Sequence, residues 1–109
     1  MDKRLLNTKT VVTGGSRGIG AEIVKRLFNE GSDIIIADIL EDEANDLINS
    51  LKAKDRILFH RTNLSEENQI LDLFKFVKSK WGTLNFLINN AGIEDGFLVK
   101  DQSYEDYKK

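Results

Sequence analysis

The feature that most constrains the fold of this chain is a short apolar run that ends in a cluster of glycines. Residues 9–13 read Lys-Thr-Val-Val-Thr, a β-branched stretch typical of a buried strand. Glycines follow at positions 14, 15, 18 and 20, and apolar side chains then recur at helical spacing up to residue 30. Gly31 stands where a helix C-cap glycine belongs. The sequence therefore predicts a strand, a glycine turn and a helix in direct succession.

The rest of the chain repeats this alternation of strands and helices. Apolar runs predict further strands at residues 33–38, 56–60 and 84–88. Helices between them are indicated by two stripes, the second with Ser65 as its N-cap: Ala44, Leu47, Ile48 and Leu51, then Ile70, Phe74, Val77 and Trp81. The order βαβαβαβ indicates the α/β class. We expect a Rossmann-type doubly wound parallel sheet with helices on both faces, truncated after the fourth strand, followed by a loop and a helix beginning at Ser103.

Length and composition exclude several classes of function. A chain of 109 residues can build one core, so we expect residues 1–109 to form a single domain. Sixteen basic against 18 acidic residues give a net charge of −2, which provides no basic surface for nucleic acid or for a membrane. Cysteine is absent, and the start of the chain turns polar too early for a signal peptide. We expect a cytoplasmic protein without a metal site.

The glycine turn has the position of a phosphate-binding loop. Gly14 permits a sharp turn, Gly18 allows close approach of the backbone to a pyrophosphate, and Gly20 allows tight packing of the helix. Asp38 ends the second strand 18 residues after Gly20, near the spacing at which a carboxylate accepts hydrogen bonds from ribose hydroxyls. The pattern favours dinucleotide binding, with an ordinary glycine-rich turn and a solvated acid as the alternative.

Two segments carry a resemblance to a known family. Residues 13–20 read Thr-Gly-Gly-Ser-Arg-Gly-Ile-Gly, and residues 87–92 read Leu-Ile-Asn-Asn-Ala-Gly. In this order they are similar to the short-chain dehydrogenase/reductase family, and within it to the 3-oxoacyl-[acyl-carrier-protein] reductases. The resemblance covers the whole chain. It implies an NAD(P)-dependent oxidoreductase that transfers hydride between a nicotinamide and a carbonyl or an alcohol.

The resemblance also assigns cofactor-binding residues by position. They are Gly14, Ser16, Arg17, Gly18, Ile19 and Gly20 near the pyrophosphate and its ribose, Asp38 and Ile39 near the adenosine ribose, Asn63 and Leu64 near the adenine, and Asn90, Ala91 and Gly92 along the ribose. Asn89 would brace the sheet. Relatives usually have an aspartate where this chain has Asn63, whose amide oxygen could still accept a hydrogen bond from the adenine.

The choice between the two nicotinamide cofactors depends on opposite charges. The carboxylate of Asp38 would repel a 2′-phosphate, which favours NAD. Arg17 acts in the other direction, because many relatives that use NADP have a basic residue at this place. Since Asp38 occupies the hydroxyl site itself, NAD is favoured over NADP.

No catalytic residue is assigned to this chain. The family's catalytic Ser and Tyr-x-x-x-Lys pair lie beyond the fourth strand, at positions that are not present. Tyr104 and Lys108 match the spacing, but they fall in the helix directly after the fourth strand, so a catalytic role is not expected. His60 stands alone in a strand without a second ligand or base, which favours a structural role.

Two functions follow from these observations. The first is the cofactor-binding N-terminal portion of a short-chain oxidoreductase, inactive as this chain alone. The second is a non-catalytic module that binds a nucleotide or another protein. In either case the fourth strand would present an unpaired edge with Phe86 and Ile88, so we expect self-association or an oligomer.

Overall fold

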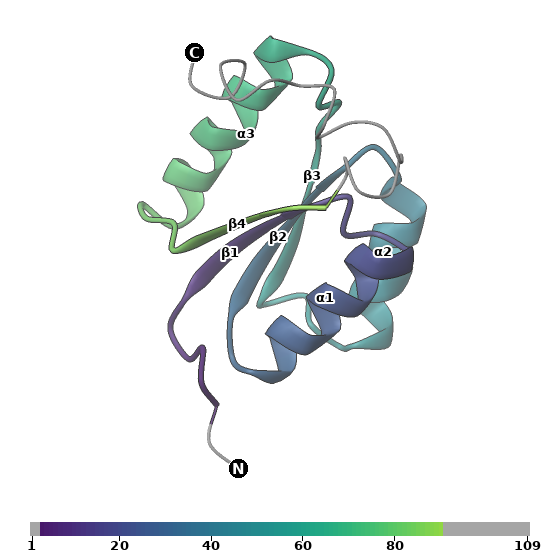
Figure 1. Ribbon diagram of the computed structural model, residues 1–109, viewed down its shortest axis with the longest axis vertical. Helices are drawn as coiled ribbons and strands as arrows, with labels where there is room; N and C mark the ends of the chain where they lie inside the picture. The colour runs from purple at the N-terminus through teal and green to yellow at the C-terminus, as the bar shows by residue number, and fades with distance from the viewer. Residues whose placement is uncertain (1–2, 91–109) are drawn as a thin grey trace.

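Seven helices and strands alternate along the part of the chain that the computed structural model describes, residues 3–90 (Figure 1). They are β1 (Lys9–Thr13), α1 (Gly18–Asn29), β2 (Asp33–Asp38), α2 (Glu41–Ser50), β3 (Ile57–Arg61), α3 (Glu67–Lys80) and β4 (Phe86–Asn89). Every strand and helix predicted within this range is present, and the last two strands begin one and two residues later than predicted. The predicted helix at Ser103 lies outside the described residues.

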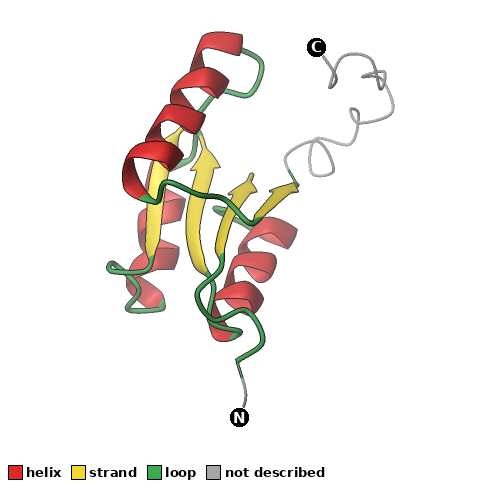
Figure 2. Ribbon diagram, turned by 90° about the vertical axis from the view of Figure 1, so that its left-hand side faces the viewer, coloured by secondary structure: helices red, strands yellow, loops and turns green. Residues whose placement is uncertain are grey.

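The four strands form one parallel sheet in the order β3-β2-β1-β4. This is the order in which a doubly wound Rossmann sheet begins. Helices α1 and α2 cover one face of the sheet and α3 covers the other, so that they lie on opposite sides of the strands in Figure 1, and Figure 2 views the sheet from the α3 side. The predicted Rossmann-type α/β fold is therefore confirmed.

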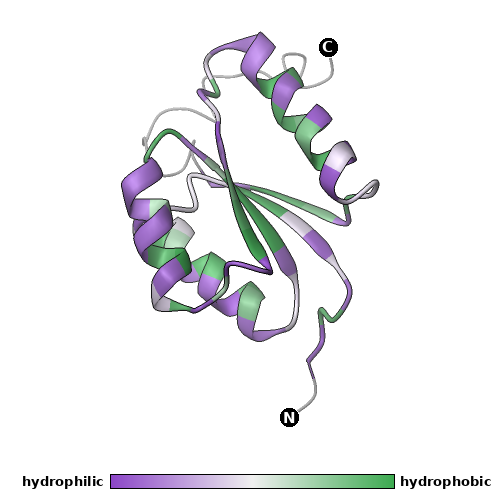
Figure 3. Cartoon of the chain, turned by 180° about the vertical axis from the view of Figure 1, so that it is seen from behind, coloured by the Kyte–Doolittle hydropathy of each residue, from purple (hydrophilic) through white to green (hydrophobic). Residues whose placement is uncertain are grey.

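Burial on both faces explains the continuous apolar runs of the central strands. Ile34, Ile35 and Ile36 of β2 are all fully buried, although neighbouring strand residues point to opposite faces. Ile34 and Ile36 belong to the core beneath α1 and α2, whereas Ile35 belongs to the core beneath α3. In Figure 3 the hydrophobic colour accordingly runs along the sheet, and the helices carry hydrophilic residues on their outer sides.

The start and the buried face of α3 differ from the prediction. The N-cap is Glu66, whose side chain makes no capping hydrogen bond, and the predicted cap Ser65 instead donates its hydroxyl to Asn63. The residues of α3 that are buried are Leu73 and Val77, while Phe74 is 40% exposed. Polar side chains before a helix can bond to one another locally, and this competition moves the helix start.

Strand β4 is an edge strand within the described part of the chain. Phe86 and Leu87 point to opposite faces, yet they are 44% and 49% exposed. Phe86 and Ile88 therefore both lie on an edge strand of the described sheet, as predicted. Their side chains differ, since Phe86 is exposed, whereas Ile88 is partly buried against the core beneath α1 and α2.

His60 gives the fold a pH dependence. Its Nδ1 lies 2.8 Å from Thr62 Oγ1, and its ring lies 4.8 Å from the ring of Phe76 on α3. Burial lowers the pKa of His60 below 6.5, and the nearby Asp72 carboxylate partly offsets this by raising it. The unfolded chain therefore binds a proton more readily than the folded chain. His60 contributes this stability fully above pH 6.5, and the contribution is lost as the pH falls toward the lowered pKa.

We expect His60→Asn, which keeps a polar group near Thr62, to reduce the pH dependence of stability. The free energy of unfolding, measured by urea titration from about pH 7.5 to about pH 5.5, should fall less steeply in the variant than in the parent chain. Parallel curves for the two proteins would contradict the assignment.

Candidate functional site

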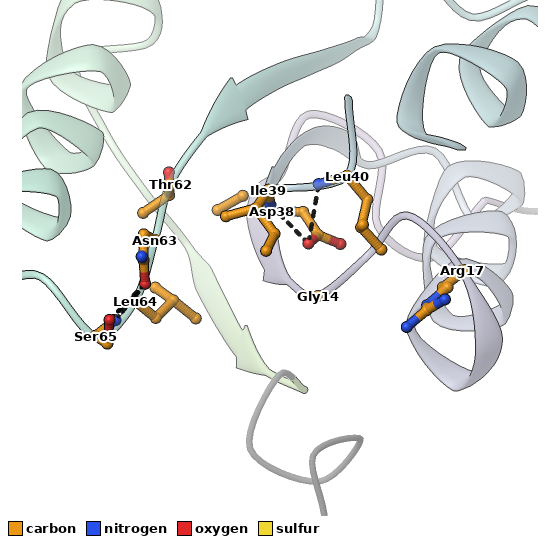
Figure 4. Close-up of a pocket in the computed structure, with 10 residues that line it drawn as sticks. Gly14, Arg17, Asp38, Ile39, Leu40, Thr62, Asn63, Leu64 and Ser65 are labelled. Atoms are coloured by element: carbon orange, nitrogen blue, oxygen red, sulfur yellow. Dashed lines mark hydrogen bonds between the residues drawn. The ribbon is translucent and has the colours of Figure 1, made fainter. Parts of the chain in front are cut away.

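A cleft of about 290 Å³ opens where the carboxyl ends of β1, β2 and β3 meet (Figure 4). In open parallel sheets ligands bind at this edge, because the loops that follow neighbouring strands converge there. Gly14 and Arg17 contribute from the loop after β1, residues 37–40 from the end of β2 and the loop after it, and residues 62–65 from the loop after β3. The three loops are those that the sequence predicted.

The glycine loop leaves the first turn of α1 open toward this edge. Gly14 and Gly18 have φ angles of +66° and +61°, a backbone conformation that favours glycine. The N–H of Gly14 donates to Ala37 O at 2.9 Å, which ties the loop to β2. Helix α1 has no acidic residue in its first turn, and its N-cap, Arg17, makes no side-chain capping bond. The free N–H groups and the helix dipole can therefore receive an anion.

Gly20 brings the backbone of α1 into close contact with the backbone of the glycine loop at Gly14. A Cβ placed on Gly20 would lie 1.9 Å from Gly14 O and 2.6 Å from Asn90 Nδ2. Asn90 Nδ2 also donates to Gly14 O, at 3.1 Å, from a fully buried side chain. Beside it, Asn89 Oδ1 accepts a hydrogen bond from Thr13 Oγ1 at 3.0 Å. Asn89 thus joins the end of β4 to the end of β1, and Asn90 joins the residue after β4 to the glycine loop.

Asp38 joins two of the loops through its carboxylate. Its Oδ1 accepts hydrogen bonds from the N–H groups of Ile39 at 2.7 Å and Leu40 at 3.4 Å, and its Oδ2 accepts one from the N–H of Ser16 at 3.2 Å. A carboxylate has about four acceptor positions, so one on Oδ2 remains for a ligand. The contact between Asp38 and Ser16 was not foreseen from the sequence. The hydroxyl of Ser16 is buried and has no partner among residues 3–90.

Arg17 lies on the other side of the cleft from the loop after β3. Figure 4 shows it beyond Leu40 as seen from Asp38, and no ion pair joins Arg17 to Asp38 in the described part of the chain. Its side chain is exposed. A cation and an anion are therefore presented to the same cleft without neutralising each other through direct contact.

Asn63 makes local bonds that the sequence did not indicate. Its Oδ1 accepts hydrogen bonds from the N–H of Ser65 at 3.0 Å and from the hydroxyl of Ser65 at 2.6 Å. Its own N–H donates to Gln69 Oε1 at 2.7 Å. The sequence predicted that the amide oxygen of Asn63 accepts a hydrogen bond from the adenine. In the structure this oxygen already accepts two hydrogen bonds from Ser65.

The cleft brings together about half of the residues predicted for cofactor binding. Those that line it are Gly14, Arg17, Asp38, Ile39, Asn63 and Leu64. Ser16, Gly18, Ile19, Gly20 and Asn90 lie around the loop but do not line the cleft, and Ala91 and Gly92 are outside the described residues. The prediction omitted Ala37, Leu40, Thr62 and Ser65. Each is at a strand end or in the loop that follows, so the rule that strand ends line such sites would have found them.

No group of His, Asp and Glu side chains within residues 3–90 is arranged to hold a metal ion. No helix in the same range is long and apolar enough to cross a membrane.

Comparisons with known proteins agree with this arrangement. The short chain dehydrogenase family matches residues 8–109. The 3-oxoacyl-[acyl-carrier-protein] reductase FabG of Chlamydia pneumoniae is 34% identical over 109 residues, which cover 99% of this chain and 44% of that protein. The 3-beta-hydroxysteroid dehydrogenase of Comamonas testosteroni is 39% identical over 93 residues, covering 85% of this chain and 36% of that protein.

A solved structure extends the comparison to three dimensions. The Pseudomonas aeruginosa RhlG/NADP active-site complex superimposes with a TM-score of 0.74 at 30% identity, covering 83% of this chain and 36% of that chain. The chain therefore spans less than half the length of these relatives. On the family match, the sequence identities and the shared fold, the chain belongs to the short-chain dehydrogenase family.

Proposed function

We propose that the chain is the cofactor-binding N-terminal portion of an NAD(P)-dependent short-chain oxidoreductase, which transfers hydride between a nicotinamide and a carbonyl or an alcohol. The observation that carries the proposal is the order in which the different chemical groups follow the strands around the cleft. Open N–H groups follow β1, the Asp38 carboxylate follows β2, and apolar and amide side chains follow β3. Phosphate, ribose and base follow one another in the same order in the adenosine half of a dinucleotide.

The residues present fit this half of the cofactor. A cleft of about 290 Å³ is at the small end of ligand sites, as suits part of a dinucleotide. Asp38 Oδ2 keeps one acceptor position for a ribose hydroxyl, and Ile39 and Leu64 offer apolar surface to a base. When bound, the nicotinamide would supply the hydride donor or acceptor. The residues of this cleft would hold and orient the adenosine end.

The relatives support a dinucleotide cofactor of either kind. The name of the Pseudomonas aeruginosa structure includes NADP, and the Chlamydia pneumoniae relative is a 3-oxoacyl-[acyl-carrier-protein] reductase by name. Within the proposal, the preference for NAD rests on Asp38 in this chain.

Calorimetric titration with three ligands tests the proposal. NADH and ADP-ribose, which both carry the adenosine half, should bind with similar affinity. Nicotinamide mononucleotide lacks this half and should bind far more weakly. Failure of both NADH and ADP-ribose to bind at millimolar concentration would overturn the proposal, and so would equal binding of all three ligands.

We also expect the isolated 109-residue chain to lack reductase activity. The proton-donating Tyr and its Lys, as the family places them, are not among its residues. Tyr104→Phe should therefore leave the rate of NADH oxidation with an acetoacetyl thioester at the buffer blank. Tyr104 lies outside the described residues, and turnover that this substitution abolishes would assign it a catalytic role.

Self-association of the isolated chain is a further expected result. The exposed Phe86 and Leu87 lie on an edge strand of the sheet that residues 3–90 form, and within this range that edge offers both apolar surface and unpaired backbone groups. Sedimentation at tens of micromolar should show species larger than a monomer, and Phe86→Lys should shift the distribution toward the monomer. A single monomeric species for the parent chain would contradict the expectation.

A further inference from the structure

Three exposed apolar side chains lie on the α3 side of the sheet, toward its β4 edge. Leu71 and Phe74 of α3 are 57% and 40% exposed, and Leu87 of β4 is 49% exposed. Leu71 and Phe74 are three residues apart in the helix, so they lie on one side of it. We call these three residues the α3–β4 shelf. Apolar residues are common singly on a protein surface, whereas a group of them indicates a surface that another element covers.

The orientation of each shelf residue follows from its neighbours. Leu87 pairs with Val11 across the sheet, and Val11 belongs to the core beneath α3, so the side chain of Leu87 points to the α3 face. On α3, the ring of Phe76 lies 4.8 Å from the ring of His60, so Phe76 points toward β3. Phe74 lies about 160° round the helix from Phe76 and points away from β3. In the strand order β3-β2-β1-β4, this flank of α3 is the one on the side of β4.

The handedness of the connections places a helix that follows β4 on the same face. Helix α3 connects β3 to β4 across the face opposite to α1 and α2. Connections between parallel strands are right-handed, so a helix that leaves β4 and continues across the sheet in the direction of α3 also lies on the α3 face. Both helices then start from the carboxyl edge of the sheet. The first turns of the new helix therefore lie beside the first half of α3, which carries Leu71 and Phe74.

The sequence predicts such a helix at residues 103–109, outside the described residues. Ser103 is its predicted first residue, and Tyr104 and Tyr107 follow at the i, i+3 spacing of one helix face. A tyrosine ring offers apolar surface and a hydroxyl that can stay in water, which suits a helix at the rim of a small apolar surface. We propose that residues 103–109 dock on the α3–β4 shelf as a helix, with the rings of Tyr104 and Tyr107 against its apolar side chains.

A second copy of the chain is the competing occupant of the shelf. The edge strand β4 also exposes Phe86, but neighbouring strand residues point to opposite faces, so Phe86 lies on the face away from α3. Contact between copies through Phe86 and the edge of β4 therefore leaves the shelf free for residues 103–109.

The reaction of a maleimide with Phe74→Cys tests the proposal, because the chain has no cysteine of its own. Asp72→Cys is the matched control, since Asp72 is exposed on the flank of α3 near His60. A docked segment should slow the reaction at position 74 at least about fivefold relative to position 72, at every protein concentration. Equal rates would overturn the proposal. Slowing that appears only as the protein concentration rises would assign the shelf to a second copy and would also overturn it.

Further substitutions identify the segment that covers the shelf. Adding Tyr104→Ser and Tyr107→Ser to the Phe74→Cys chain should raise its rate to that of the control, because the apolar contacts of both rings are lost. Asp106→Ser changes the same segment away from the face that carries the two tyrosines, so it should leave the slow rate unchanged. A slow rate that persists without the tyrosines would overturn the proposal, since another part of the molecule would then cover position 74.

Discussion

Gly20→Ala is expected to destabilise the chain by about 3–5 kcal/mol, a large fraction of the stability of a small domain. The added Cβ would lie 1.9 Å from Gly14 O and 2.8 Å from Gly14 C, well inside van der Waals contact with backbone atoms. It would also lie 2.6 Å from Asn90 Nδ2, which itself bonds to Gly14 O. Relief would require α1 to move away from the glycine loop, and the buried bond between Asn90 and Gly14 would then be lost.

Gly82→Ala is the matched control for this experiment. Gly82 has a φ of +73°, but a Cβ there would meet no atom within 4 Å. The control substitution carries only the backbone strain, about 1–2 kcal/mol. Chemical denaturation of both variants should therefore show a much larger loss for Gly20→Ala. Equal losses would mean that α1 adjusts to a side chain at position 20 without a steric cost.

The part of the fold that the sequence could predict is the part that depends on burial alone. The three isoleucines of β2 must be covered on both faces, and a central strand of a parallel sheet provides that cover. The glycine loop could be located for a different reason. Glycine is the residue that most easily adopts a positive φ angle, and Gly14 and Gly18 do so directly after a strand.

The face of α3 could not be predicted in the same way. Apolar residues occur at positions 70, 71, 73, 74, 76 and 77, so they surround much of the helix. Spacing alone allows several stripes, and the packing against β1 and β2 selects the one that contains Leu73 and Val77. Phe74 consequently faces solvent, although its size and spacing suited the core.

Hydrogen bonding within the loops was also beyond the reach of sequence patterns. The positions of Asp38 and Asn63 at strand ends could be read from the chain, but not which donors reach their oxygens. Ser16 binds Asp38 from 22 residues away, and Ser65 binds Asn63 within one turn. These bonds decide which acceptor positions remain for a ligand, so the chemistry of the cleft required the structure.

Asp38 is expected to give the chain a preference for NADH over NADPH of at least about tenfold. Its Oδ1 is held by two backbone N–H groups and its Oδ2 by one, so the carboxylate is fixed with one acceptor position on Oδ2 open. A ribose 2′-hydroxyl can donate to that position, in a charge-assisted bond of about 1.5–3 kcal/mol. The 2′-phosphate of NADPH cannot donate there, and it would meet a like charge that the loop prevents from moving away.

Asp38→Ser should remove most of this preference, because the charge and the charge-assisted bond are lost together. Arg17, which is exposed at the same cleft without an ion pair to Asp38, then becomes the dominant charge for a 2′-phosphate. Asp42→Ser is the control, since it makes the same chemical change in the exposed first turn of α2, away from the cleft lining. Titration of the three proteins with NADH and NADPH should show a changed preference only for Asp38→Ser. Equal affinity of the parent chain for both cofactors would show that Asp38 organises the loops without reading the ribose.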